Sequence, residues 1–286
     1  MKLTIYILIA ASMLFGSVSV SSAKSSEHEP KQDITIDQWH LSLNTGLGIM
    51  TNPLKGGSDL PLVLIPEVAY YAEHLFFDNG RLGYSLEPDS PHVVNLVSEF
   101  NPETRFFVNW HPTNIFALSS SNSFIASSPV ELKEQQPKLD INELNKRRWA
   151  LDAGLSYHYI YEKHVFSAQA LADISGVYQG WRSALQWQMT HKIGKIHVKP
   201  SLGVWYKSAQ LNNYFYGVSE KENPNEAIAV GSSLQPYAKI DARWPLSEVN
   251  SVRFHLAYYD YSALADSPLF EKTYSMTAFL GFDHIF

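Results

Sequence analysis

The last fourteen residues of the chain alternate between two kinds of side chain. One face is apolar and carries no charge; it comprises Tyr274, Met276, Ala278, Leu280, Phe282 and Phe286. The other face is polar or small, with Thr273, Ser275, Thr277, Gly281 and Asp283. This period of two residues predicts a strand with lipid against one face and water against the other.

The same period recurs in at least five other segments, whose apolar faces run through Trp39–Ile49, Trp149–Tyr159, Ile196–Tyr206, Leu234–Trp244 and Val252–Tyr258. A soluble sandwich would also alternate, but its strands usually have about 5 or 6 residues. Strands of 11 to 14 residues match the roughly 9 to 11 tilted residues that cross a bilayer. Aromatic residues at the ends of the apolar faces predict interfacial girdles, and charges on the opposite faces suit a watery lumen. We therefore expect an all-β protein, a transmembrane antiparallel β-barrel over residues 38–286.

The connections between these strands fall into two classes. With the C-terminus in the periplasm, short periplasmic turns are expected at Ala72–His74, Phe100–Glu103, Ile160–His164, Thr190–Lys195 and Pro245–Asn250. Longer polar loops are expected outside, at Met50–Leu60, His111–Arg147, Ile174–Gly180, Lys207–Ser232 and Ser262–Lys272. The count is about twelve strands. Ten is the alternative, because Asp78-Asn79-Gly80 inside Leu75–Leu86 could itself be a hairpin turn.

Two prolines on outward faces, Pro200 and Pro236, oppose a regular strand because proline lacks the N–H that the ladder needs. We expect a bulge at each of them.

The N-terminus predicts export. A basic start, an apolar run over Leu3–Phe15 and the small residues Ser21–Ala23 predict a secretory signal peptide over residues 1–23. Residues 24–37 are charged and lack alternation, which predicts a flexible periplasmic segment. The aromatic C-terminal Phe286 resembles the signal that bacterial barrel-insertion machinery reads. The expected location is the outer membrane of a Gram-negative cell, with membrane lipid and lipopolysaccharide as its surroundings.

Composition excludes several classes of protein. The formal charge is −6 and no long basic patch occurs, so nucleic acid is not an expected partner. The absence of cysteine excludes disulfides, thiolate chemistry and a lipid-modified N-terminal cysteine. The scattered histidines give no metal-ligand spacing, so we expect no metal or other cofactor.

The sequence gives little support for an enzymatic function. Ser156 and His158 share one strand face, but that face is the expected lumen, whereas the deacylases among outer-membrane barrels act at the lipid-facing rim. We interpret them as polar residues of a wet interior and expect no enzyme activity.

Short motifs along the chain support a family resemblance. They are Phe76–Asn79 followed by Leu82–Tyr84, then Ala150–Gly154, Ala172–Gly176, Asn213–Val218 and Asp266–Pro268. In this order they resemble the MipA/OmpV family of outer-membrane proteins. Relative to shorter members of that family, Asn114–Lys146 resembles an expanded segment. The resemblance implies a barrel fold and a scaffold that joins a murein lytic transglycosylase to a murein synthase. Other members of the family are porin-like or contact host surfaces, so the resemblance leaves a porin-like channel and a surface-exposed adhesin as alternatives.

Two groups of residues are candidate sites. The first is a lumen cluster near the periplasmic ends of consecutive strands: His197, Lys199, Asp241, Arg243, Arg253, His255 and Asp283. It predicts either a cationic constriction that favours anions or a salt-bridged plug. The second is the aromatic run Tyr214, Phe215 and Tyr216 in an outer loop, which either packs on neighbouring loops or forms a surface contact site.

Overall fold

The computed structural model describes residues 36–86, 88, 90–108, 114 and 140–286. The expected signal peptide, residues 1–23, and nearly all of the expected flexible segment, residues 24–37, lie outside this range and stay predictions. Most of the expected outer loop His111–Arg147 also lies outside it. All the strands belong to one compact unit, Thr35–Phe286.

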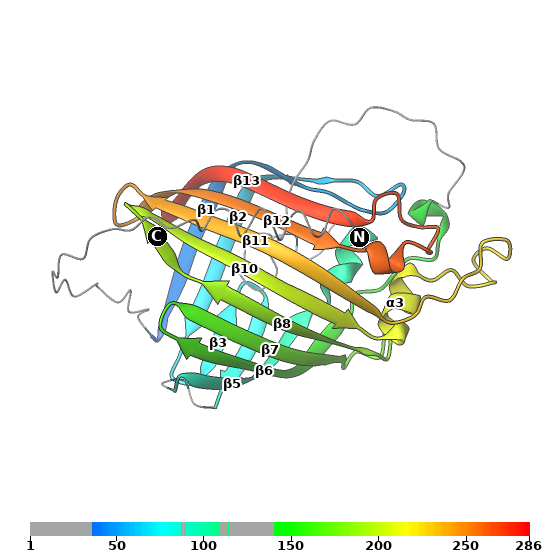
Figure 1. Cartoon of the computed structure of the whole chain (residues 1–286), viewed down its shortest axis with the longest axis horizontal. Helices are drawn as coiled ribbons and strands as arrows, with labels where there is room; N and C mark the ends of the chain where they lie inside the picture. The colour runs from blue at the N-terminus through cyan, green and yellow to red at the C-terminus, as the bar shows by residue number, and fades with distance from the viewer. Residues whose placement is uncertain (1–35, 87, 89, 109–113, 115–139) are drawn as a thin grey trace, which may run out of the picture. The chain divides into compact units, whose positions relative to one another are not determined.

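The described residues form one closed antiparallel sheet (Figure 1). Its strands are β1 (Gln38–Met50), β2 (Leu60–Tyr71), β3 (Leu75–Asp78), β4 (Arg81–Ser85), β5 (His92–Phe100), β6 (Leu151–Tyr161), β7 (His164–Asp173), β8 (Trp181–Met189), β9 (His191–Ile193), β10 (Ile196–Lys207), β11 (Ser233–Pro245), β12 (Asn250–Asp260) and β13 (Tyr274–Ile285). Neighbouring strands pair, β1 pairs with β13, and the pairing of β10 with β11 closes the ring. β8 and β9 pair with the same side of β10 in one register, so together they form one interrupted strand. The fold is a twelve-stranded barrel, as expected.

Neither expected proline bulge is present, because each proline lies where its missing N–H costs no ladder bond. The register between β10 and β11 is continuous through both Pro200 and Pro236. Pro200 adjoins the interruption between β8 and β9, and Pro236 lies one residue beyond the pairing of β11 with β12. The register shift in the β1–β2 pair lies instead between Thr45 and Gly48.

Leu75–Leu86 is a hairpin and not the one long strand that we expect from the sequence. β3 and β4 are joined through Asn79 and Gly80, whose φ angles of 50° and 88° fit a tight hairpin turn. The chain therefore reverses earlier than expected. Phe100–Glu103, expected as a periplasmic turn, lies at the opposite end of the barrel, where a 3-10 helix, η1 (Pro102–Phe106), is buried.

The two ends of the barrel differ in their connections. The turn end holds the short β6–β7 and β11–β12 turns together with the start of β1 and the end of β13. The loop end holds Met50, Phe100, Lys207 and Asp260, the residues at which β1, β5, β10 and β12 finish.

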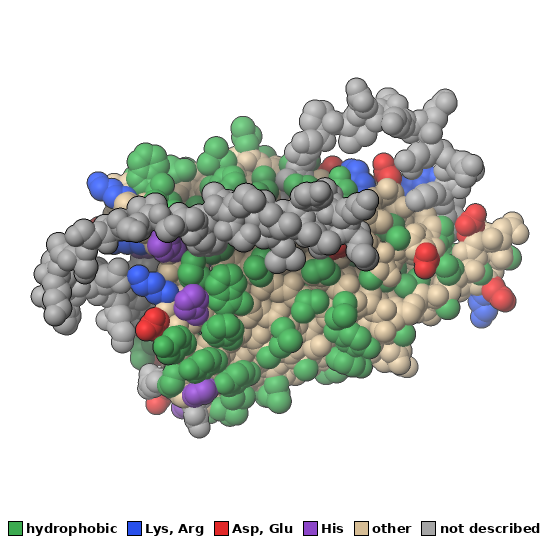
Figure 2. All heavy atoms as spheres, viewed as in Figure 1, with side chains coloured by type: hydrophobic (Ala, Val, Ile, Leu, Met, Phe, Trp, Pro, Cys, Tyr) green, Lys and Arg blue, Asp and Glu red, His purple; other side chains and the backbone are tan. Residues whose placement is uncertain are grey.

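The two faces of the sheet differ as the alternation predicts. Outward side chains such as Leu47 and Leu280 are 79% and 58% exposed, whereas inward Thr277 and Asp283 are fully buried. Figure 2 shows apolar side chains spread over the outer surface of the strands. Among the described residues, no helix is long and apolar enough to span a membrane.

A hydrophobic core fills the lumen at the loop end. It is built from inward strand residues and from η1, α3 (Ala209–Tyr216) and η3 (Ser262–Leu264), and its buried members are Met50, Leu54, Phe106, Ala150, Tyr178, Leu211, Phe215, Tyr216, Val218, Tyr237, Ala257, Tyr259, Tyr261, Leu264, Leu269 and Phe270. A further 3-10 helix, η2 (Ile141–Glu143), also lies at this end, where the N–H of Ile141 donates to the Lys55 carbonyl. Burial of so many apolar side chains stabilises the loops and closes this mouth.

Candidate functional site

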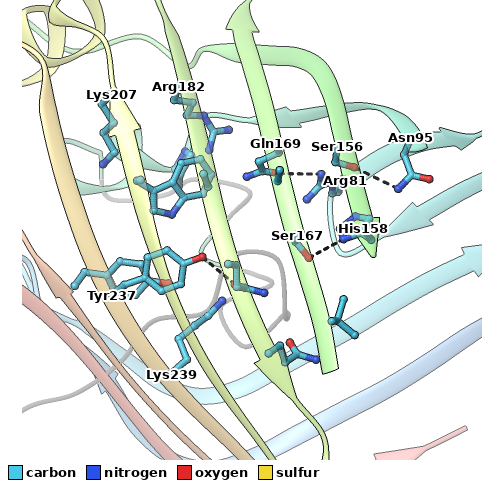
Figure 3. Close-up of a pocket in the computed structure, with 18 of the residues that line it drawn as sticks. Arg81, Asn95, Ser156, His158, Ser167, Gln169, Arg182, Lys207, Tyr237 and Lys239 are labelled. Atoms are coloured by element: carbon cyan, nitrogen blue, oxygen red, sulfur yellow. Dashed lines mark hydrogen bonds between the residues drawn. The ribbon is translucent and has the colours of Figure 1, made fainter. Parts of the chain in front are cut away.

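The lumen contains a cavity of about 290 Å³ next to the loop-end core, lined by both polar and apolar side chains. Its wall comes from most of the strands, β3 to β8 and β10 to β12, together with η1. Figure 3 shows side chains that line it, including His158, Gln169, Arg182, Tyr237 and Lys239. We call this space the inner chamber.

An ion-pair network, the loop-side network, lies beside the inner chamber and consists of Arg81, Glu99, Asp152 and Arg182. Arg182 Nε donates to Asp152 Oδ2 at 2.6 Å, and its Nη2 donates to Glu99 Oε1 at 2.8 Å. Arg81 Nη1 lies 3.5 Å from Glu99 Oε2. The side chains of Arg182, Asp152 and Glu99 are at most 2% exposed, so each charge depends on its partners to offset desolvation.

A second buried pair ties the strands to the loop-end core. Lys207 Nζ at the end of β10 donates to Glu103 Oε1 in η1 at 2.6 Å, and the Tyr216 hydroxyl of α3 donates to the same carboxylate. Burial alone would raise the pKa of Glu103, but the Lys207 ammonium and these hydrogen bonds hold it below its ordinary value. Sequence reasoning missed Glu103, because it placed this residue in an exposed turn.

The sequence-predicted lumen cluster is partly assembled at the turn end. Arg253 Nη2 donates to Asp241 Oδ2 at 2.9 Å, and the Nδ1 atom of His255 lies 3.0 Å from the same oxygen. Arg243 Nη2 lies 3.4 Å from Asp283 Oδ2. Five of the seven predicted residues therefore take part in ion pairs at this end, in two groups.

His197 and Lys199 are at the same end but make no ion pair with a described residue. They lie opposite Arg243 and Asp241 in the β10–β11 register. Lys199 is exposed and His197 is partly exposed, so water reaches this mouth.

Sequence reasoning missed the acidic residue at the centre of this network, Glu67. Its Oε1 accepts a 2.5 Å hydrogen bond from Arg253 Nη1, and its Oε2 lies 3.9 Å from Arg243 Nη2. Glu67 follows the irregular part of β2, where strict alternation no longer identifies the inward face. The turn-side network therefore consists of Glu67, Asp241, Arg243, Arg253, His255 and Asp283.

The expected surface contact at Tyr214, Phe215 and Tyr216 needs correction. These residues form the last turn of α3, and Phe215 and Tyr216 are fully buried in the loop-end core. A fully buried side chain cannot make a surface contact. Only Tyr214 is partly exposed, and its hydroxyl accepts a hydrogen bond from the Arg148 N–H at 2.9 Å.

Ser156 and His158 face the lumen and line the inner chamber, as expected. Asn95 Nδ2 donates to Ser156 Oγ at 3.3 Å, while His158 Nδ1 lies 2.8 Å from Ser167 Oγ (Figure 3). The two residues therefore bond to different partners and do not form a serine–histidine pair. No group of three or more metal-ligating side chains occurs within the part of the chain that the structure describes.

Comparison with known proteins gives one family and several distant relatives. Residues 45–286 match the family described as MltA-interacting protein MipA. The MltA-interacting protein of Escherichia coli (strain K12) is 24% identical over 243 residues, covering 82% of this chain and 86% of that protein. The YiaT protein of the same strain is 23% identical over 245 residues, covering 84% and 89%.

Among solved structures, a loop-deletion mutant of OmpT, an outer membrane protein of Vibrio cholerae, aligns over 87% of this chain and 99% of that one. The TM-score is 0.34 and the sequence identity 7%. The barrel assignment rests on the strand pairing described above.

Proposed function

Because the chain belongs to the MipA family of outer-membrane β-barrel proteins, we propose that it is a non-enzymatic scaffold that binds a murein lytic transglycosylase of the MltA type. A murein synthase would be held at the same envelope site. The observation that carries this proposal is the family match over residues 45–286, together with the name of the E. coli relative.

The loop-end core supports a scaffold over the alternative of a porin-like channel. A porin needs a continuous aqueous path, whereas here Phe215, Tyr216 and Phe270 are buried across one mouth. The burial of Phe215 and Tyr216 also removes most of the aromatic surface that favoured the adhesin alternative.

In this proposal the turn end faces the periplasm and carries the docking surface. Lys192 and Lys195 are exposed there, next to the apolar Ile193, which is 59% exposed, whereas the exposed acids Glu73, Glu162 and Glu248 lie in the other turns of this end. Exposed charges at a contact rim steer association, so a partner with an acidic patch fits this end.

The test is binding of the purified, detergent-solubilised protein to an immobilised MltA-type transglycosylase. The proposal predicts saturable binding that Lys192→Glu with Lys195→Glu weakens by roughly tenfold. Lys221→Glu is the matched control, because Lys221 is an exposed lysine of the loop between α3 and β11 and should bind like the unchanged protein. Absence of binding by folded protein would overturn the scaffold, and equal loss in the control would overturn the docking surface.

A further inference from the structure

We propose that the inner chamber is a binding site for a small sugar, a mono- or disaccharide, that enters from the turn end. This inference is independent of the proposed scaffold function, because it concerns the interior of the barrel and not its rim.

The first observation is a set of amide donors aimed at the cavity. Gln169 on β7 and Gln186 and Gln188 on β8 line it from adjacent strands. The Oε1 atoms of Gln169 and Gln186 accept hydrogen bonds from Arg81 Nη2 at 3.0 Å and from the Tyr237 hydroxyl at 2.9 Å. Gln188 Oε1 accepts from the Ser201 hydroxyl at 3.4 Å.

In each of these hydrogen bonds the amide oxygen is the acceptor. The Nε2 groups of Gln169, Gln186 and Gln188 donate to no other described residue, although each amide nitrogen carries two donors. Three neighbouring donor groups fit a ligand with several acceptor oxygens.

The second observation is the charge of the chamber lining, which distinguishes a site for a neutral sugar from a site for a small anion. Arg182 is neutralised by Asp152 and Glu99, and Lys207 is neutralised by Glu103. Arg81, which also lines the chamber, lies 3.5 Å from Glu99, and the Lys239 ammonium lies 5.2 Å from the Tyr237 ring centroid. The other donors of the lining are amides and hydroxyls, which suit the many oxygen atoms of a hydroxyl-rich ligand.

The third observation is an aromatic ring in the wall. Trp205 lines the chamber, and the Arg182 guanidinium lies 5.0 Å from its ring centroid and fixes its position. The guanidinium covers one face of the indole, and the other face of this electron-rich ring is the one that can attract the weakly positive C–H groups of a sugar ring. The cavity of about 290 Å³ is at the small end of ligand pockets, which start at roughly 300 Å³, so it suits one or two sugar rings.

Access is from the turn end. Arg182 and Lys207, near the loop-end core, are 1% and 3% exposed, whereas Gln188 and His158, nearer the other end, are partly exposed and Lys199 beyond them is exposed. The chamber is therefore closed towards the loop end and open to water towards the turn end.

The test is calorimetric titration of the detergent-solubilised protein with glucose, N-acetylglucosamine and maltose. We expect saturable binding of at least one of these sugars, weakened about tenfold or more by Gln186→Leu with Gln188→Leu, since the variant removes two amide donors from the ligand. Gln210→Leu on the exposed face of α3 is the matched control and should bind normally. Trp205→Phe provides a second test in case the double variant does not fold.

Three results would overturn the inference. They are no saturable binding of any of the three sugars to folded protein, unchanged affinity in both chamber variants, and displacement of the sugar by acetate or phosphate at equal concentration. The last result would identify a site for small anions.

Discussion

Arg182 on β8 donates to Asp152 on β6 across the intervening strand β7, through a 2.6 Å hydrogen bond between Nε and Oδ2. Both side chains are essentially out of solvent. A buried charge is tolerated only while its partners remain, so this pair makes the pairing of three strands interdependent.

Removal of Arg182 should therefore be costly. Arg182→Ala leaves Asp152 and Glu99 buried with too few cationic partners, and we expect it to lower the free energy of unfolding by about 3–5 kcal/mol. Urea unfolding followed by tryptophan fluorescence measures this. Arg148→Ala, at an exposed arginine, should stay within about 0.5 kcal/mol of the unchanged protein. Similar losses in the two variants would contradict the role of the loop-side network.

The two arginines of the turn-side network should behave differently. Arg253 is 6% exposed and contacts both Asp241 and Glu67, whereas Arg243 is 35% exposed and its carboxylate contacts are longer, at 3.4 Å and 3.9 Å. We expect Arg253→Ala to destabilise the barrel by several kcal/mol and Arg243→Ala by about 1 kcal/mol or less. The midpoints of heat-modifiable migration on gels provide the comparison. If Arg243→Ala costs as much as Arg253→Ala, burial is not what sets the strength of this network.

The loop between α3 and β11 should loosen in acid. Arg147 Nη1 donates to Glu222 Oε1 at 2.6 Å, and the Ser219 N–H donates to Oε2 at 3.0 Å. Burial opposes ionisation, but these bonds lower the pKa of Glu222 from its ordinary 4.5 to about 2. The stabilisation is therefore complete above pH 4.5 and is lost as pH falls towards 2.

Hydrogen exchange of the Ser219 and Asn145 amides tests this, since both donate to Glu222. Their protection factors should fall between pH 5 and pH 2.5, and in Glu222→Gln they should be low at both values. A pH-independent protection factor in the unchanged protein would contradict the assignment.

Loss of the loop-end core should open the barrel without unfolding it. Phe215 contacts Phe107, Tyr178 and Tyr214 at ring-centroid distances of 4.9 to 6.0 Å. Phe215→Ser removes these contacts, while the strand ladder remains intact. We expect faster swelling of liposomes in a small sugar and retained heat-modifiable folding. Leu47→Ser, on the outward face, should leave swelling unchanged.

Alternation along the sequence predicted most of the strands and their faces, because a one-residue slip would expose every inward polar group to lipid. It failed where the period breaks. The sequence indicates a possible hairpin at Asn79-Gly80. This turn adds one reversal of the chain, so the following strand runs in the opposite direction and Phe100–Glu103 lies at the loop end and not at the turn end.

The partners within the candidate sites were harder to predict than the strands. Glu67 joins Arg253 across 186 positions of sequence, and no local pattern identifies such a pair. A local signal for α3 did exist. Ser208 caps its start by accepting the Leu211 N–H, and Leu211 and Phe215 are four residues apart on one buried face.

The central claim is that this barrel is closed at its loop end and acts through its surface. Stepwise conductance in planar lipid bilayers tests it most directly. The closed loop end predicts no stable channel from the purified, folded protein, and openings only after Phe215→Ser. Regular, long-lived conductance steps from the unchanged protein would contradict the account and favour a solute pore.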